Sequence, residues 1–250
     1  MQLIAVSEVV LMNPGKKVLA FDVYGTLIDT DGVLQALRAV VGEKASMVMN
    51  TWRSKQLEYT FRRGLMRRYA DFSVCTKEAL DFACRSAQVE LAEAEIAVLL
   101  RTYDTLPAYP DATSGLLELS GIPNIRKYAF SNGLKADVGK VLKNAGLINF
   151  FDGVISVDEV KSFKPDPVVY RHLISSVDSP AERTWLISGN SFDVIGAKSA
   201  GLGAIWLRRV QANILDSWEY KPDAVIGSIE EIRGFIAASE SDNGAAANVG

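Results

Sequence analysis

Residues 17–27 read KVLAFDVYGTL, a short apolar run that ends in a carboxylate and passes into a glycine-containing turn. Apolar runs of this length without polar alternation are typical of strands that are buried on both faces of a parallel sheet. We therefore predict a strand over residues 17–22, with Asp22 at its carboxyl end.

Five further runs of this kind occur downstream: RKYAFSN (126–132), DGVISVDEV (152–160), RTWLISGN (183–190), GAIWL (203–207) and DAVIGS (223–228). Helix-like amphipathic segments separate them. This alternation predicts an α/β fold in which a mainly parallel, doubly wound sheet of Rossmann type is built from right-handed crossovers. In such a sheet, ligands bind outside the carboxyl ends of the strands. The polar residues that the sequence places there are Asp22, Ser131 with Asn132, Asp158, and Ser188 with Asn190.

The strand pattern is absent between residues 29 and 107, where helical periodicity replaces it. We predict an all-helical cap over 29–107, inserted into a discontinuous core domain of residues 1–28 and 108–236. The two prolines of LPAYPDA, residues 106–112, suit the returning linker. Residues 237–250 are small, polar and without period, so we expect a disordered tail.

Composition excludes several classes of protein. The 250 residues are 48% hydrophobic and 23% charged, as expected of a soluble globule, and are enough for one large domain with an insertion or for two small domains. No apolar run approaches the length of a membrane span, and the N-terminal residues lack the basic start of a secretory signal. We therefore expect a cytoplasmic protein that does not bind membranes. A formal charge of −3 without any Lys/Arg block argues against nucleic acid as a partner.

The chain offers few residues for thiol or histidine chemistry. Cys75 and Cys84 lack C-x-x-C spacing, so we expect free thiols and neither a disulfide nor a zinc site. His172 is the single histidine, in a helix-like run, and we interpret it as a surface or boundary residue. A Ser-His-Asp or Cys-His arrangement is therefore not expected.

Four short motifs follow one another in a characteristic order: FDVYGTL (21–27), FSNG (130–133), KPDP (164–167) and SGNSFD (188–193). Together they resemble the haloacid dehalogenase-like hydrolase superfamily, over residues 18 to 232. The resemblance implies a nucleophilic aspartate, a Ser/Thr, a lysine and a final acidic loop at successive strand ends. In this sequence these are Asp22, with Thr26 nearby, Ser131, Lys164 and Asp193.

Two positions depart from the phosphatases of that superfamily, in which acidic groups and the nucleophile hold magnesium. Tyr24 stands where their proton-donating acid follows the nucleophile by two residues, and Gly189 stands where they carry another carboxylate. Crowded carboxylates repel by about 4 kcal/mol at 4 Å and an effective dielectric of 20, which is why such sites need the metal. We expect this site to work without a metal or any other cofactor.

The same departures resemble the L-2-haloacid dehalogenase branch. WRSKQLEYTF, residues 52–61, is similar to the helix that carries the halide-binding arginine there, which points to Arg53. Ser54 replaces the usual glutamine beside that arginine, and Phe192 replaces a common tryptophan. Both differences bear on substrate size and halide preference.

A leaving halide needs no proton, so the loss of the acid at position 24 does not impair dehalogenation. The expected reaction is hydrolysis of a short L-2-halo acid to a 2-hydroxy acid, with inversion at C2, through an ester on Asp22. Lys164 would keep Asp22 and Asp193 ionised by lowering their pKa values. Arg53 would receive the halide, helped by Asn132 or nearby amides.

The remaining site residues are expected to bind substrate or water. Side chains expected to hold the substrate carboxylate, with backbone N–H groups after the first strand, are Ser131 and Thr26. Those expected to orient water with Asp193 are Asn190 and Ser188, with Tyr170 bonded in the same cluster. Those expected to form the halide rim and the apolar walls are Tyr24, Leu57, Phe72 and Phe192.

Alternatives remain open at this stage. A magnesium-dependent phosphatase that tolerates Tyr24, or a catalytically silent relative that binds a carboxylate, would share these motifs. Arg53 could lie on a solvated helix face beside Lys55 and Glu58, and Leu57 could belong to the core. The resemblance also implies a homodimer, with a 2-halo acid and water as the reacting partners.

Overall fold

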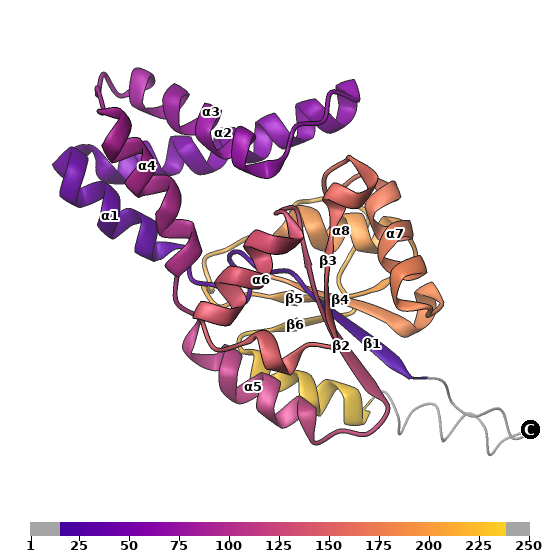
Figure 1. Ribbon diagram of the computed structural model, residues 1–250. Helices are drawn as coiled ribbons and strands as arrows, with labels where there is room; N and C mark the ends of the chain where they lie inside the picture. The colour runs from indigo at the N-terminus through magenta and orange to yellow at the C-terminus, as the bar shows by residue number, and fades with distance from the viewer. Residues whose placement is uncertain (1–15, 239–250) are drawn as a thin grey trace, which may run out of the picture.

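The computed structural model describes residues 16–238. They form a six-stranded sheet with helices on both faces, and a separate group of helices lies beyond the carboxyl ends of the strands (Figure 1). The strand order is β3-β2-β1-β4-β5-β6, and every neighbouring pair is parallel. The strands are β1 (Lys17–Phe21), β2 (Ile125–Ser131), β3 (Gly153–Ser156), β4 (Thr184–Ser188), β5 (Gly203–Leu207) and β6 (Ala224–Ile226). The predicted α/β fold with a doubly wound parallel sheet is confirmed.

Strand β1 shows why a continuous apolar run forms a central strand. Successive side chains of a strand point to opposite faces of the sheet. Leu19 and Phe21 accordingly belong to one buried cluster, whereas Val18 and Ala20 belong to the other. Because both faces are covered by helices, the strand is apolar at its buried positions, 18–21, and the next polar residue, Asp22, lies beyond its end.

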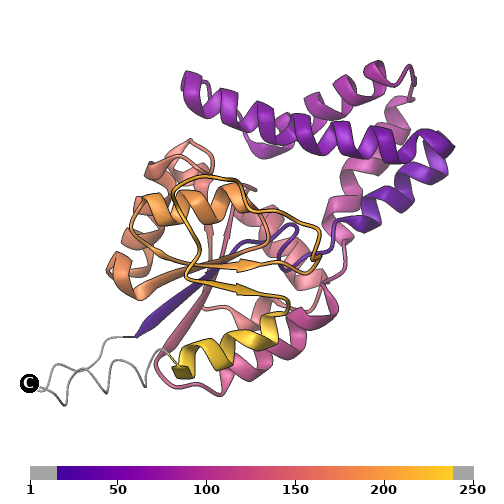
Figure 2. The same ribbon diagram turned by 180° about the vertical axis from the view of Figure 1, so that it is seen from behind.

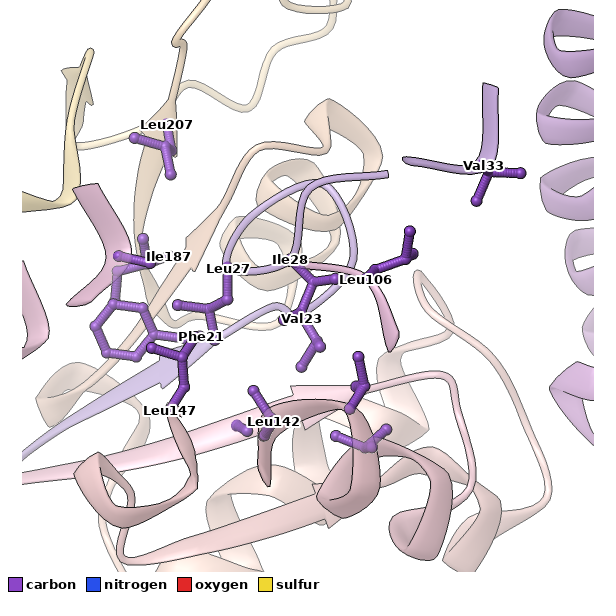
Figure 3. Packing of buried hydrophobic residues seen from close by; sticks show 14 of the residues in the cluster. Phe21, Val23, Leu27, Ile28, Val33, Leu106, Leu142, Leu147, Ile187 and Leu207 are labelled. Atoms are coloured by element: carbon purple, nitrogen blue, oxygen red, sulfur yellow. The ribbon is translucent and has the colours of Figure 1, made fainter. Parts of the chain in front are cut away.

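Helices cover both faces of the sheet, and each face has its own buried cluster. The first cluster packs under α5 (Pro110–Ser120), α6 (Lys135–Asn144) and a helical segment at 232–238. The second packs under α7 (Pro167–Val177) and α8 (Ser191–Ser199). Figure 3 shows the first cluster extending from Phe21 through Leu27 and Ile28 toward Val33, so one core joins the sheet to the start of the helical group.

The helical group consists of α1 (Asp31–Val41), α2 (Ala45–Met66), α3 (Phe72–Ser86) and α4 (Glu93–Thr102). These helices lie away from the sheet in both views (Figures 1 and 2). Buried residues of α2 recur every third or fourth position, at Ala45, Val48, Trp52, Gln56 and Thr60. This stripe faces α3, where Trp52 Nε1 donates to Thr76 O at 2.8 Å. The predicted helical cap is confirmed.

The chain enters and leaves the cap through two segments that lie side by side. Asp29 N donates to Pro107 O, and Tyr109 N donates to Leu27 O, each at 2.9 Å. We propose that this pair of crossings divides a core domain from the cap at residues 28/29 and 107/108. The short 3-10 helix η2 (Tyr103–Thr105) and the extended residues after it complete the return.

Two expectations need correction or fall outside the structure. The run 152–160 was expected to be one strand, but β3 ends at Ser156 and a 3-10 helix, η4 (Val157–Val160), follows, because Ser156 Oγ accepts from Asp158 N and turns the chain. The expected disordered tail lies outside the described residues beyond 238, whereas 237 and 238 are helical. Within the part of the chain that is described, no helix is both long and apolar enough to cross a membrane.

The short remaining 3-10 helices join these elements. They are η1 (Gly42–Lys44), η3 (Ile148–Phe150), η5 (Ala181–Arg183) and η6 (Ile229–Glu231). Helix α5 packs on η6 at Gly115, where an added Cβ would lie 2.6 Å from Ile229 Cγ2 and 2.9 Å from Glu230 N. A methyl group at position 115 would push the backbone of α5 away from that of η6.

Gly115→Ala should therefore lower the free energy of unfolding by about 1–3 kcal/mol, as overpacking does in well-packed cores. Gly139→Ala is the matched control, because Gly139 lies within α6 and nothing stands within 4 Å of an added Cβ. That change should instead raise stability by about 0.5–1 kcal/mol through helix propensity. Urea denaturation of both variants measures the difference, and a stabilised Gly115→Ala protein would contradict this packing.

Candidate active site

Asp22 lies at the carboxyl end of β1, where the strand order reverses between β2 and β4. Its backbone N–H extends the sheet by donating to Ile187 O at 2.9 Å. The chain then turns sharply at Gly25, whose φ of +80° is unfavourable for residues with a Cβ. This turn directs Thr26 back toward the Asp22 carboxylate.

The two oxygens of Asp22 have different surroundings. Oδ1 accepts from Lys164 Nζ at 3.1 Å. Oδ2 accepts from three donors: Thr26 Oγ1 at 2.8 Å, Ser188 Oγ at 3.2 Å and Asn190 Nδ2 at 2.7 Å. The residue is 7% exposed. The carboxylate is therefore fixed in one orientation, with fewer hydrogen bonds on Oδ1.

Lys164 connects Asp22 to Asp193. Its ammonium group donates to Asp193 Oδ2 at 2.7 Å and to Phe130 O at 2.9 Å, besides Asp22. Tyr170 Oη donates to the other oxygen of Asp193, Oδ1, at 2.8 Å. Lys164, Tyr170 and Asp193 are all buried, so this cluster is removed from bulk water.

The electrostatics of the two carboxyl groups differ. Burial raises the pKa of Asp22, but the Lys164 ammonium and the hydrogen bonds from Thr26, Lys164 and Asn190 outweigh it, and the pKa lies below its ordinary value. Burial also raises the pKa of Asp193, Lys164 lowers it, and the charge of Asp22 raises it again, to about 6.

Lys164 lowers the pKa of both carboxyl groups, as expected, but only the pKa of Asp22 ends below its ordinary value. The physical reason is that Asp193 is buried without the three neutral donors that Asp22 has on Oδ2. Burial lowers the pKa of Lys164 itself, but its two carboxylate neighbours raise it by more, so the ammonium form is favoured.

Three predicted site residues make hydrogen bonds that differ from those expected. Thr26 was expected to hold the substrate carboxylate, but its buried hydroxyl donates to Asp22 and accepts from Gly189 N at 2.9 Å. Ser188 and Asn190 were expected to orient water with Asp193, but both donate to Asp22 Oδ2. The loop after β4 therefore orients the Asp22 carboxylate.

Arg53 reaches this network from the cap. Its Nη2 donates to Asn190 Oδ1 at 3.2 Å and its Nη1 donates to Gln56 Oε1 at 2.8 Å. The side chain is half-buried rather than directed into solvent. Since Asn190 also donates to Asp22, one amide side chain joins the cap guanidinium to the Asp22 carboxylate.

Ser131 and Asn132 border the network at the end of β2. Ser131 Oγ accepts from Gly133 N at 3.2 Å, which leaves the hydroxyl hydrogen available to an anion. Asn132 Oδ1 accepts from Lys164 N at 3.0 Å and fixes the backbone that carries the lysine. Both residues are buried.

The predicted apolar residues divide between two cavities at the boundary of cap and core. Tyr24 and Phe72 line a cavity of about 270 Å³, and the Tyr24 ring meets the edge of Tyr103. Phe192 lines a cavity of about 840 Å³ together with Lys164, and its ring meets Phe61 of the cap. Leu57 is half-buried on α2, and it is not among the residues that line these two cavities.

Asp158 and His172 do not join the network. Asp158 Oδ1 accepts from Tyr69 Oη at 2.7 Å and pairs with Lys161. His172 lies on α7, 3.5 Å from Glu159, in agreement with a boundary position. Cys75 and Cys84 are both free and buried.

Comparisons with known proteins agree with this geometry. A model of the haloacid dehalogenase-like hydrolase family matches residues 16–201. The (S)-2-haloacid dehalogenase of Xanthobacter autotrophicus is 38% identical over 201 residues, 80% of this chain and 78% of that protein. One from Pseudomonas putida is 33% identical over 220 residues, 87% of this chain and 96% of that protein. The solved structure of the Xanthobacter autotrophicus L-2-haloacid dehalogenase with chloropropionic acid covalently bound is similar, with a TM-score of 0.82, 30% identity, and coverage of 89% of this chain and 98% of that one.

The chain belongs to the haloacid dehalogenase-like hydrolase family. Within that family, its relatives of 30% identity or more place it in the L-2-haloacid dehalogenase branch. The resemblance in the four motifs is thereby confirmed over most of the chain.

The magnesium site of the family's phosphatases does not fit the residues of this haloacid dehalogenase-like hydrolase. Lys164 Nζ lies between Asp22 and Asp193, where it supplies the positive charge. A side chain at position 189 would begin with a Cβ only 2.5 Å from Gly25 O, so a carboxylate cannot be added without moving the turn. In residues 16–238, no group of three or more His, Cys, Asp or Glu side chains is arranged to hold a metal ion.

Two contributors to the site were missed in the sequence. The carbonyl and ring of Phe130 both contact Lys164 Nζ, the ring centroid at 4.2 Å. A backbone carbonyl leaves no residue-specific signal. Gln56 was also missed, although its position three residues after Arg53 on a helix could have indicated the contact.

Replacing Lys164 by methionine should leave Asp22 and Asp193 facing each other without a cation. We expect a loss of about 3–5 kcal/mol in the free energy of unfolding near neutral pH. Without the ammonium group the folded-state pKa values of both carboxyls rise, so the folded state binds more protons than the unfolded chain. The loss should therefore shrink as the pH falls from about 8 to about 5.

Urea denaturation at both pH values measures this effect. Lys161→Met is the matched control, because Lys161 pairs with Asp158 at the surface and should cost at most about 1 kcal/mol. An equal loss for Lys164→Met at both pH values would contradict the assignment of Lys164 as the counterion of the two carboxylates.

Proposed function

We propose that this protein hydrolyses short L-2-haloalkanoic acids to 2-hydroxy acids, with inversion at C2, through a covalent ester on Asp22 and without a metal. One observation carries the proposal: a buried carboxylate held by Lys164 lies one amide side chain, that of Asn190, away from the cap guanidinium of Arg53. The covalently bound chloropropionic acid in the similar Xanthobacter autotrophicus structure supports it.

In the first step, Asp22 attacks C2 of the substrate. A carbon–oxygen bond forms as the carbon–halogen bond breaks, and the halide leaves with the bonding pair. The three donors on Oδ2 hold that oxygen, so Oδ1 is the attacking atom. The lowered pKa of Asp22 keeps the nucleophile ionised at neutral pH.

The departing halide is stabilised by the charge of Arg53. Electrostatic stabilisation is strongest in a site that is shielded from water and arranged in advance. Asn190 holds one nitrogen of the guanidinium before substrate arrives. The halide requires no proton, so Tyr24 is not needed as an acid; burial raises the pKa of Tyr24 above its ordinary value, which keeps the phenol neutral.

The substrate carboxylate is held by the Ser131 hydroxyl and by backbone N–H groups of the loop after β1. The side chain of Ser131 suits this task because its oxygen already accepts from Gly133 N, which leaves its hydrogen for an anion. The apolar rings of Tyr24, Phe72 and Phe192 exclude water from the reacting carbon.

In the second step, water attacks the carboxyl carbon of the ester. Asp193 accepts a proton from that water, and the bond between the carboxyl carbon and the ester oxygen breaks. The leaving oxygen, still bound to C2, takes the proton from Asp193, so the 2-hydroxy acid leaves and Asp22 is regenerated as a carboxylate with one oxygen from water, its remaining proton passing to solvent. The charge of Asp22 is one cause of the raised pKa of Asp193. Ester formation removes that charge, so Asp193 remains ionised for the step that needs it.

We extend the proposal to a homodimer in the cytoplasm that acts on a small 2-halo acid and water, and that binds neither membranes nor nucleic acid. The resemblance to the L-2-haloacid dehalogenase branch supports the dimer. The net charge of −3 supports the absence of a nucleic acid partner.

The protein should release chloride from L-2-chloropropionate in the presence of excess chelator, and Asp22→Asn should abolish the release because an amide is not a nucleophile here. Chloride is measured directly over time. Asp81→Asn, an exposed cap residue paired with Arg85, is the matched control and should keep full activity. An inert native protein, or phosphate release that requires added magnesium, would reject the proposal.

A single turnover in heavy-oxygen water tests the ester. The water oxygen enters the carboxyl group of Asp22, because water attacks the ester at that carbon. Mass analysis of the peptide that contains residue 22 should show the label, and the first-turnover product should lack it. Label in the product alone would mean direct attack by water on C2.

A further inference from the structure

Gln56 is a buried amide on α2, and neither the sequence motifs nor the proposed mechanism assigns it a role. It belongs to the stripe of α2 that faces α3, and its exposed fraction is 0%. A buried amide needs partners for both its oxygen and its nitrogen, since an unpaired buried polar group destabilises the folded state. The partners of Gln56 lie on both sides of the helix stripe.

The orientation of this amide is determined by Thr76 of α3. Thr76 Oγ1 donates its one hydrogen to Phe72 O at 2.8 Å, so it can only accept from Gln56. Gln56 Nε2 donates to it at 2.8 Å. The carbonyl oxygen Oε1 is therefore directed to the opposite side, where Arg53 Nη1 donates to it at 2.8 Å.

The contacts continue from Arg53 into the core. Arg53 Nη2 donates to Asn190 Oδ1 at 3.2 Å, and Asn190 Nδ2 donates to Asp22 Oδ2 at 2.7 Å. A long flexible side chain is thus held at two nitrogens, one by the cap and one by the core. Such a planar group loses less freedom on binding an anion when it is already oriented.

The neutrality of Gln56 matters as much as its position. A carboxylate at this place would also hold the guanidinium, but its negative charge would offset much of the attraction between the guanidinium and an anion at similar distance. An amide oxygen orients Arg53 and leaves its full positive charge for the anion.

We propose that Gln56 is the positioning residue for Arg53, holding its guanidinium where the halide departs without neutralising it. This inference rests on the proposed function, because it concerns the leaving halide. It follows that Gln56 affects poor leaving groups most, since a carbon–chlorine bond needs more stabilisation of the departing anion than a carbon–bromine bond.

The test compares kcat/KM for L-2-chloropropionate and L-2-bromopropionate, because this constant reports the steps up to halide departure. Gln56→Met keeps the length but loses the acceptor. It should lower kcat/KM for the chloro acid by about 10–100-fold and for the bromo acid by less than about 10-fold. Gln56→Glu keeps an acceptor but adds a negative charge. It should lower kcat/KM for the chloro acid at least as much as Gln56→Met does.

The ratio of the two constants does not depend on the fraction of folded enzyme, so a merely structural defect leaves it unchanged. Thr60→Val is the matched control, since Thr60 is buried on the same stripe and donates to Leu57 O rather than to Arg53. It should preserve the wild-type ratio.

Each outcome decides the question. A raised bromo-to-chloro ratio in both Gln56 variants, with the Thr60→Val ratio unchanged, supports the inference. An unchanged ratio in either Gln56 variant overturns it while the proposed function stands, provided that the native protein releases halide. A native protein that releases no halide from either acid overturns both.

Discussion

The arrangement of this protein depends on one buried ammonium group between two carboxylates. Lys164 comes from the segment before α7, Asp22 from the end of β1 and Asp193 from α8, and Lys164 Nζ lies within 3.1 Å of an oxygen of each. Burying three charges is costly, and it is tolerated only when each has close partners. The carbonyl and ring of Phe130, the hydroxyl of Tyr170 and the donors on Asp22 supply those partners. The cluster therefore ties the sheet to the α7 and α8 side of the molecule.

Two changed positions beside this ammonium group explain how a fold shared with metal-dependent phosphatases accommodates a different reaction. A divalent cation gathers acidic ligands, whereas an ammonium group of single charge balances fewer of them. Here one carboxylate position has become Gly189, whose place is closed by Gly25 O, and another has become Tyr24. A reaction that expels an anion without protonating it has no need of the missing groups, and in the proposed mechanism a cap guanidinium provides the charge where the anion leaves.

The cap completes the site from outside the sheet. Hydrogen bonds run from Thr76 on α3 through Gln56 and Arg53 to Asn190 and Asp22, so the packing of two cap helices determines where the guanidinium lies relative to the nucleophile. The edge contacts of Phe61 with Phe192 and of Tyr24 with Tyr103 lie at the same boundary. The chemistry of the core and the packing of the cap are thus coupled through side chains that are mostly neutral.

Much of this was readable in the sequence, for a definite reason. A strand buried on both faces must be apolar, so six apolar runs were sufficient to predict the sheet. A parallel sheet brings the carboxyl ends of its strands together, which places Asp22, Ser131 and Ser188 near one another. What the sequence did not determine depends on direction and burial. Thr26, Ser188 and Asn190 were identified, but only the tertiary structure directs their hydrogen bonds to Asp22 Oδ2. The pKa of Asp193 rises to about 6 because the fold buries it beside another carboxylate, a quantity set by solvent exclusion and distance. The orientation of Gln56 depends on a hydroxyl of another helix, and no pattern along one chain segment records which way an amide points.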